Sequence, residues 1–388
     1  MRDGWKEISL EELENSGVIK LGRGDVISKK DMEADPGPNP VYSSAENKNG
    51  MIGKYAKFMF DEELITWSVD GGGHIFYRPK HKFSVTNIGG WLRILNDKVF
   101  SYQFLTYALQ RLHKQHSFDW QHKAHPSVIR KLYTRIPLPS LSEQKRIVDL
   151  ISSVDSYIEA LQQQLVSAKR SRNAVLHELL TTGGDDWVET SLGEIADWGS
   201  GGTPKADIAE YYGGAIPWCV IGDLTEGEVW ETEKAISQLG LTNSSAKIID
   251  PGSVLLAMYG ASIGRTGISA IPMATNQAIA FAKCKEESVL SKYLLVYLQT
   301  QKSKFIEMGQ GAAQPNISQT IIKSWPITLP PIDHQKKVIE RIDSFSKLIE
   351  NTELLGYETK KLRSSLLSEL LSGSHEIPST YDKVLGAA

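Results

Sequence analysis

The segment Gly260–Thr266, GASIGRT, comes nearer than any other in the chain to a phosphate-binding loop. Such a loop needs four residues between its glycines and a lysine after the second, so that backbone N–H groups and one ammonium surround the phosphates. Here three residues separate the glycines and an arginine follows. We therefore predict no nucleotide site in this segment.

A second glycine run, DGGGH at 70–74, supports two readings. It is either a hairpin turn or a loop that lets the backbone approach a phosphate or a base edge closely, because glycine adopts turn conformations freely.

Histidines are concentrated in the first third of the chain, and four of the nine lie in one stretch: His113, His116, His122 and His125. No cysteine accompanies them, and their spacing matches no recognised zinc site, so we predict no metal. A solvated polar loop and a set of phosphate contacts both remain open. An enzyme with an unrecognised site in this stretch is a further alternative.

No arrangement of residues predicts catalysis. A nucleotide methyltransferase needs a glycine-rich cofactor loop and an acidic or Asn–Pro–Pro–aromatic motif. The segment LPPID at 329–333 lacks both the polar residue before the prolines and the aromatic residue after them. Two cysteines, Cys219 and Cys284, are too few for a disulfide framework. The N-terminal residues lack a signal-peptide core, and no apolar run reaches the ~20 residues of a membrane span. We expect a cytoplasmic chain without contact to a membrane.

An internal repeat organises the whole chain. Ile136, Gln144–Lys145 and Ile151 recur 191 residues later as Ile327, Gln335–Lys336 and Ile342. The match continues without a gap for over forty positions, so the chain consists of two halves, 1–183 and 184–388. Each half is a variable body followed by a similar helix.

Each repeated helix carries an apolar residue at alternating steps of three and four, which is the heptad pattern of a coiled coil. The seam positions are Ile147, Ile151, Val154, Ile158, Leu161 and Leu165 in the first helix, and Val338, Ile342, Phe345, Ile349, Leu366 and Leu370 in the second. In the middle of the second helix the seam falls on Thr352, Gly356 and Thr359. A neighbouring stripe there, Leu348, Leu355 and Leu362, predicts that the seam shifts along this helix.

Arg172 and Arg363 occupy the same repeat position inside the two seams. Each is either exposed where the seam has rotated away or paired with a carboxylate of the other helix, with Asp155, Glu159, Glu350 and Glu353 as candidates. Some 40 helical residues extend ~60 Å. Two such helices are expected to pack on each other in antiparallel orientation, with the bodies at opposite ends, because neither would be stable alone. Packing of each helix on its own body is the alternative.

The fold class predicted is therefore two mixed α/β globular domains separated by a long antiparallel two-helix coiled coil with an internal pseudo-twofold. The predicted domains are 1–139, 140–183 (first helix), 184–330, 331–373 (second helix) and a tail at 374–388. Residues 1–139 hold 20 Lys/Arg and 16 Asp/Glu, whereas residues 184–330 hold 10 and 16. Net charge alone thus gives no support for nucleic-acid binding.

These features together resemble one family, the specificity subunits of type I restriction-modification systems. The two helix-starting segments LPSLSEQKRIVDLISSVDSYI and LPPIDHQKKVIERIDSFSKLI are similar to the two conserved helical regions of that family. The second body adds SLGEIADWGSGGTPK, IPWCVIGDL, MYGASIGRTGI, ATNQAIA and GAAQPNIS, and the first adds NPVYSSAENKNGMIGKY and WSVDGGGHIFYR. The resemblance covers nearly the whole chain.

The resemblance implies a non-catalytic DNA-recognition chain. Each body would be a target-recognition domain that reads one half of a bipartite site in double-stranded DNA, and the coiled coil would set the spacer. Two methyltransferase subunits would dock on the chain, bind S-adenosylmethionine and flip out the target adenine; the chain itself would hold no cofactor. Motor-nuclease subunits would join for cleavage.

Polar loop residues in these family-like segments are the candidates for contact with DNA, since Asn and Gln suit adenine whereas Arg and Lys suit guanine or phosphate. They are Ser43, Ser44, Asn47, Asp70, His74, Arg78, Lys80 and Asn87 in the first body, and Thr203, Lys205, Tyr259, Ser262, Arg265, Asn276, Gln277, Gln314 and Asn316 in the second. For each, a hydrogen bond that stabilises a turn is the alternative. For the whole chain, the alternatives are the specificity chain of a restriction system that cuts on both sides of its site, and a coiled-coil scaffold that binds proteins instead of DNA.

Overall fold

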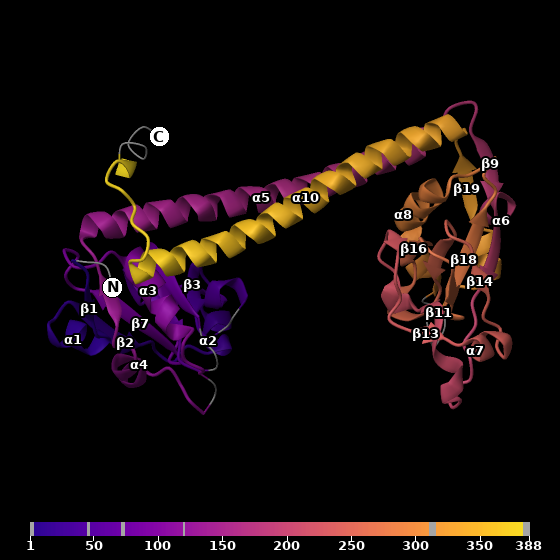
Figure 1. Ribbon diagram of the computed structural model, residues 1–388. Helices are drawn as coiled ribbons and strands as arrows, with labels where there is room; N and C mark the ends of the chain where they lie inside the picture. The colour runs from indigo at the N-terminus through magenta and orange to yellow at the C-terminus, as the bar shows by residue number, and fades with distance from the viewer. Residues whose placement is uncertain (1–3, 45–46, 71–73, 119–120, 310–315, 383–388) are drawn as a thin grey trace. The chain divides into compact units, whose positions relative to one another are not determined.

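The computed structural model describes residues 4–44, 47–70, 74–118, 121–309 and 316–382 (Figure 1). Internal contacts divide the chain into unit 1, Met1–Gln163 with Leu354–Ala388, and unit 2, Gln164–Glu353. Each unit therefore holds one globular domain and part of both long helices, α5 (Leu141–Thr181) and α10 (Ile332–Ser372). The domain boundaries inferred from the sequence stay a prediction, since the compact units cut across both helices.

A six-stranded sheet forms the centre of unit 1. Its order is β2 (Ile19–Arg23), β7 (Gly89–Ile94), β5 (Phe60–Ser68), β6 (Ile75–Val85), β3 (Asn39–Tyr42) and β4 (Met51–Tyr55). β3 runs parallel to β6, and the other neighbouring pairs are antiparallel. The central strand β5 is buried without interruption from Leu64 to Ser68, as expected of a strand covered on both faces. β5 and β6 are consecutive antiparallel strands on either side of the glycine run at 70–74.

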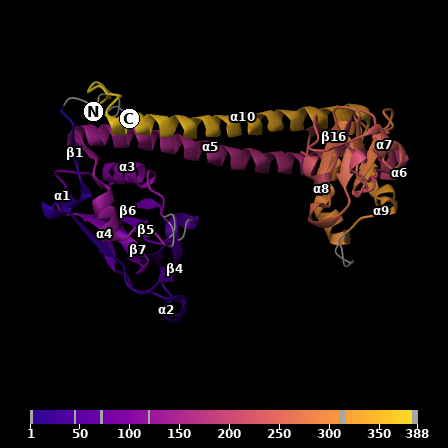
Figure 2. The same ribbon diagram turned by 60° about the horizontal axis from the view of Figure 1, so that its bottom comes forward.

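Helices cover this sheet and connect it to the long helices. They are α1 (Leu10–Asn15), α2 (Lys29–Ala34), α3 (Tyr102–His113) and α4 (Pro126–Leu132), with a 3₁₀ turn η1 (Asn47–Gly50). Figure 2 shows α3 between the sheet and the first turns of α5. Phe104 of α3 shares one apolar core with Ile65 of the sheet, Ile151 of α5 and Leu370 of α10. A short ribbon of β1 (Lys6–Ile8) and β8 (Ile136–Leu138) leads into α5.

Besides a two-stranded ribbon, the described part of unit 2 contains two sheets. One has the order β10 (Ala196–Ser200), β18 (Ile279–Cys284), β15 (Val254–Ala257), β16 (Thr266–Ser269) and β12 (Glu228–Val229). The other has the order β13 (Ala235–Ile236), β11 (Tyr212–Cys219), β17 (Met273–Thr275) and β14 (Ile248–Ile249).

The helices of unit 2 repeat the plan of unit 1. They are α6 (Leu192–Ile195), α7 (Gln238–Thr242), α8 (Ser291–Gly309) and α9 (Gln319–Lys323), with 3₁₀ turns η2 (Ala209–Tyr211), η3 (Ile221–Asp223) and η4 (Gly260–Ser262). Leu294 of α8 shares a core with Leu256 of the sheet, Leu176 of α5 and Ile342 of α10. A ribbon of β9 (Val188–Ser191) and β19 (Pro326–Leu329) leads into α10, as β1 and β8 lead into α5.

The two long helices run antiparallel within each unit. In unit 1, Arg146 pairs with Asp382, just beyond α10, and Asp155 pairs with Arg363, so the numbers fall along one helix as they rise along the other. In unit 2, Lys169 pairs with Glu353 at 2.7 Å, and the imidazole Nε2 of His334 lies 3.3 Å from the carbonyl oxygen of Leu179. The predicted fold class, mixed α/β domains with an antiparallel pair of long helices from an internal repeat, is confirmed.

The expected shift of the second seam is wrong. Thr352 and Thr359 are buried, at 6% and 9% exposure, whereas Leu348, Leu355 and Leu362 of the neighbouring stripe are exposed. The threonine hydroxyls donate to the carbonyls of Leu348 and Leu355 at 2.7 Å. A threonine can therefore occupy the seam because its own helix satisfies its polar atom.

The C-terminal segment after Gly373 packs on unit 1. Gly373 has φ 72°, the left-handed conformation that commonly ends a helix. Ile377 is 5% exposed and belongs to the same core as Trp5 near the N-terminus. Both ends of the described chain are thus fixed to unit 1.

Candidate nucleic-acid interface

Three strand ends converge in unit 1. Ser43 follows β3, and its hydroxyl accepts a 2.7 Å hydrogen bond from the Thr86 hydroxyl at the end of β6. Asn87 comes next in the chain, is exposed, and accepts from the guanidinium of Arg23 through its carbonyl. Ser43 itself is buried, so its hydroxyl serves to join the two strand ends, whereas the side chain of Asn87 is open to a ligand.

The β5–β6 turn reaches the same place. The amide of Val69 donates to the carbonyl of Ile88 at 2.9 Å, so Asp70 and Asn87 each stand next to a bonded residue. Asp70 forms an ion pair with Lys123 at 3.0 Å, and His74 is exposed. Residues 71–73, the glycines of the run, lie outside the described residues.

Arg78 lies inside the domain. Its guanidinium stacks on the rings of Tyr42 (3.6 Å) and Phe76 (4.6 Å) and donates to the hydroxyl of Thr66 and the carbonyl of Asn49. Burial lowers the pKa of Arg78 to about 10. These bonds hold the 47–50 turn, where Asn49 has φ 54°.

Three further candidates belong to unit 1. Ser44 is half-buried and Lys80 is exposed on β6. Asn47 lies in η1, but its side chain is outside the described part of the structure.

In unit 2, four loops are joined by backbone hydrogen bonds. The amide of Gly202 donates to the carbonyl of Thr275 at 2.9 Å, and the amide of Asn276 donates to that of Cys219 at 3.0 Å. A Cβ on Gly201 would lie 2.0 Å from the Thr275 carbonyl oxygen, so this approach requires glycine. The loop that carries Thr203 and Lys205 is thus held against the loop that carries Asn276 and Gln277.

The third loop, at 258–264, and the fourth, which reaches α9 through 316–318, adjoin them. Met258 donates to the carbonyl of Ala278 and accepts from the amide of Ile317, and Tyr259 bridges to Asn316. Ser262 is half-buried in η4. Arg265 is turned to the carbonyl of Leu224, to which it donates at 2.6 Å. Gln314 lies outside the described residues.

Exposure separates these candidates into two groups. Those exposed to solvent are His74, Lys80, Asn87, Thr203, Lys205, Tyr259, Gln277 and Asn316. They are amide, imidazole, ammonium and hydroxyl groups, which suit base edges and phosphates. Asn276 is half-buried, and its side-chain oxygen accepts from the amide of Ala278 at 3.2 Å, a bond that shapes the loop. Each unit thus presents a cluster of polar loops with the chemistry of DNA contact.

Two residues whose roles the sequence did not predict connect the domains to the long helices. Gln144 of α5 is fully buried, accepts from the amide of Ser101 and donates to the carbonyls of Val99 and Pro139. Gln335 of α10 makes the same three bonds to Leu290, Ser288 and Pro330. We call these two sets of bonds the glutamine latches. The repeated Gln–Lys pair was the only signal of them in the sequence.

In the described part of the chain, no three His, Cys, Asp or Glu side chains are grouped so that they could hold a metal ion. No described helix combines the length and apolarity needed to cross a bilayer. In the His-rich stretch, the Nδ1 atom of buried His113 lies 2.5 Å from the Tyr133 hydroxyl.

Comparison with known proteins gives a consistent answer. The sequence model described as "Type I restriction modification DNA specificity domain" matches residues 3–170 and 184–356, once in each half. The MjaVIII type I specificity subunit of Methanocaldococcus jannaschii is 23% identical over an alignment of 388 positions, which covers 92% of this chain and 89% of the relative.

Two solved structures share the fold. The type I S subunit from M. genitalium superposes with a TM-score of 0.58 at 15% identity, covering 95% of this chain and 97% of that one. A chain from a study of complex assembly and conformational transition in the type I R-M system gives a TM-score of 0.62 at 16% identity, covering 96% and 98%.

Proposed function

Because the chain belongs to the family of type I restriction-modification DNA specificity domains, we propose that each of its two domains reads one half of a bipartite DNA site. The observation that carries this proposal is the duplicated site. Both units present a cluster of exposed polar loops, and in both a glutamine latch ties the domain to a long helix. Two different readers on one repeated frame suit an asymmetric, split sequence.

The proposal assigns reading of bases to the loops. Exposed amides such as Asn87 and Gln277 would contact adenine edges, and Lys80 and Lys205 would contact phosphates. Buried Arg78 would act by holding the 47–50 turn in place. The low net charge is compatible with this role, because base reading depends on local polar groups and partner subunits can supply most of the phosphate contacts.

The long helices would serve two purposes. They would set the number of unread base pairs between the half-sites, and they would carry two methyltransferase subunits. Those subunits would bind S-adenosylmethionine and perform the methylation, with motor-nuclease subunits joining for cleavage. This chain would then contribute specificity and no catalytic group.

A selection experiment tests the proposal. The full chain, co-produced with its methyltransferase partner, is incubated with a random-core DNA library, and we expect enrichment of a motif with two fixed parts around an unread spacer. Exchange of residues 1–138 for those of another specificity subunit should change one half of the motif only. Enrichment of no split motif would overturn the proposal.

A second variant separates the roles of loops and helices. Insertion of one heptad into each long helix should lengthen the unread spacer and leave both half-sites unchanged. Replacement of Gln277 by Ala should alter the preference at one position, whereas Lys205→Ala should weaken binding to all sequences and reduce its salt dependence. A change in half-site sequence after the helix insertion would contradict the assignment of the spacer to the helices.

A further inference from the structure

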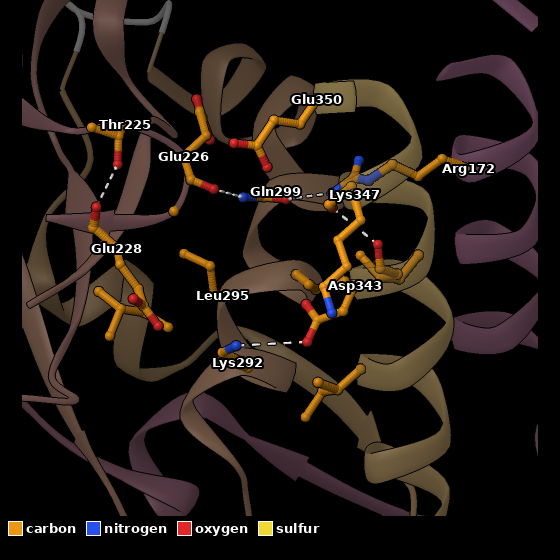
Figure 3. Close-up of a pocket in the computed structure, with 16 residues that line it drawn as sticks. Arg172, Thr225, Glu226, Glu228, Lys292, Leu295, Gln299, Asp343, Lys347 and Glu350 are labelled. Carbon is orange, nitrogen blue, oxygen red and sulfur yellow. Dashed lines mark hydrogen bonds and ion pairs between the residues drawn. The ribbon is translucent and has the colours of Figure 1, made fainter. Parts of the chain in front are cut away.

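A cavity of about 850 Å³ in unit 2 lies between α8, α10, the loop at 225–228 and the Arg172 side chain of α5 (Figure 3). Pockets of this size hold small organic ligands or protein side chains. Leu295, Val296 and Ile342 provide its apolar wall. None of the residues that line it belongs to the polar loops described above, so the cavity is separate from the candidate DNA interface.

The repeat shows what the equivalent place in unit 1 contains. Arg363, the repeat counterpart of Arg172, forms a bidentate pair with the carboxylate of Asp155, in which one bond measures 2.8 Å. Its guanidinium also lies 5.7 Å from the centre of the Tyr107 ring. The hydrogen bonds that Arg363 donates to Asp155 raise the pKa of Arg363. A carboxylate and an aromatic ring from the chain itself thus occupy this site in unit 1.

Unit 2 lacks both groups. The 191-residue repeat places Ser346 at the position of Asp155. The glutamine latches align Ser101 with Leu290, and the same count of six residues places Val296 at the position of Tyr107. The Ser346 hydroxyl donates to the Ile342 carbonyl at 2.9 Å, within its own helix. Ser346 and Val296 both line the cavity, at the positions that an aspartate and a tyrosine hold in unit 1.

Arg172 therefore carries a half-buried positive charge that few polar groups stabilise. Its one hydrogen bond among the described residues goes to the side-chain oxygen of Gln299, at 3.3 Å. No ion pair joins it to a described carboxylate, and burial lowers its pKa. In Figure 3 Gln299 stands between Arg172 and Glu226. A guanidinium has five donors, so most of those of Arg172 are available to a ligand.

None of the described acidic groups that line the cavity serves as a counter-charge for Arg172. Glu226 pairs with Lys302 at 3.1 Å, and Asp343 pairs with Lys292 at 3.6 Å. Glu228 and Glu350 are exposed, so solvent stabilises their charges. The half-buried charge that lacks a counter-charge here is that of Arg172.

We propose that this cavity binds a carboxylate from outside the chain, which pairs with Arg172 as Asp155 pairs with Arg363, with an attached ring or alkyl group against Val296. A free organic acid and an acidic side chain of a bound protein supply the same chemistry. The site is independent of the proposed reading of DNA. Because a buried bidentate pair is stronger than a single charge contact, Arg172 is the residue on which affinity depends.

The first arm of the test uses the full chain and 4-hydroxyphenylacetate, which carries the carboxylate and the phenol of the unit 1 site in one molecule. Calorimetry should show binding to the wild type, and at least tenfold weaker binding to Arg172→Met. The matched control is Arg170→Met, an exposed arginine on the same helix, which should bind as the wild type does. Ser346→Asp supplies an internal carboxylate; it should raise Tm by about 2–4 °C without the probe and abolish probe binding.

The second arm distinguishes the source. If an acidic side chain of the methyltransferase partner occupies the cavity, Arg172→Met should weaken association in the complex at least tenfold, and Arg170→Met should not. In that case 4-hydroxyphenylacetate should also compete with association. If a free organic acid occupies the cavity, association should be unchanged and the probe should bind in the first arm. If loss of Arg172 alters neither probe binding nor association, the proposal is overturned, whatever DNA motif the complex reads.

Discussion

The two units attach their domains to the long helices through two junctions, of which one is the same in both and the other differs. The glutamine latches make the same three hydrogen bonds with Gln144 and Gln335. At the arginine junction, Arg363 meets Asp155 and Tyr107, whereas Arg172 meets Gln299 and a cavity. The duplicated frame is thus kept at the start of each helix and has diverged further along it.

The largest effect is expected at the shared junction. Replacement of Gln144 or Gln335 by Leu removes the partner of one amide and two carbonyls in two adjoining loops, so each should cost about 3 kcal/mol in the free energy of unfolding. Equal costs in the two variants, measured by urea denaturation, would confirm that the latches are equivalent. The controls are the neighbouring exposed lysines, Lys145→Met and Lys336→Met. Losses no greater than theirs would show that the latches do not stabilise the chain.

Because both cysteines lie in unit 2, thiol labelling can tell the two latch variants apart. Buried Cys219 should react faster with a thiol reagent in Gln335→Leu, whose unit 2 opens more often. Gln144→Leu should leave that rate near the wild-type value. Equal acceleration by both variants would mean that the two units open together.

The second-largest effect tests the junction that differs. Asp155→Ser gives unit 1 the residue that unit 2 has at this position, and leaves Arg363 without its carboxylate. Since both side chains are partly exposed, solvent screens the lost pair, and we expect destabilisation of about 1–2 kcal/mol by thermal or chemical unfolding. Glu159→Ser, one turn along α5 and exposed, is the control and should change stability by less than ~0.5 kcal/mol. A similar value for both variants would remove the contrast between the two arginines.

These junctions also show how far the sequence predicts the structure. The repeat and the heptad spacing predicted two long antiparallel helices, because apolar periodicity reports directly on a helical partner. Whether Arg172 and Arg363 were paired could not be decided, since Asp155 and Ser346 become relevant only when the pairing of the two helices is known. The leucine stripe does not form the seam, because Thr352 and Thr359 can be buried there with their hydroxyls bonded to carbonyls of their own helix.

The sequence predicts the loops of the candidate site, but not the position of each side chain in them. Glycine-rich, polar segments predicted which loops carry the candidate residues, and backbone hydrogen bonds join most of these loops in the structure. The position of a single side chain depends on strand pairing over long distances. Arg78 was chosen for its residue type, but the pairing of β3 with β6 brings Tyr42 to it and places the guanidinium inside the domain. Contact with DNA by the exposed residues stays a prediction.

A smaller effect, on stability at high pH, distinguishes the two units. Burial raises the pKa of Cys219 to about 12, above the ~8.5 of an unfolded cysteine. The folded state therefore binds this proton more tightly, and its contribution is complete below pH ~8.5 and is lost progressively as the pH rises towards 12. At pH 9.5 unit 2 should lose about 1 kcal/mol through this thiol, whereas no described cysteine lies in unit 1. Wild type and Cys219→Ala should therefore differ less in stability at pH 9.5 than at pH 7.5; an unchanged difference would contradict the raised pKa.

The smallest effect concerns one of the seam positions at which the two helices differ. Gly356 of α10 corresponds to Leu165 of α5, and a Cβ built on Gly356 meets no heavy atom within 4 Å. Alanine restricts the unfolded chain more than glycine does, so Gly356→Ala should raise the free energy of unfolding by about 0.5–1 kcal/mol. Gly240→Ala is the contrasting control, because its Cβ would lie 2.4 Å from the Tyr211 carbonyl oxygen and should destabilise unit 2. If Gly356→Ala also destabilised the chain, the seam at this position would be packed more closely than the antiparallel pairing described here allows.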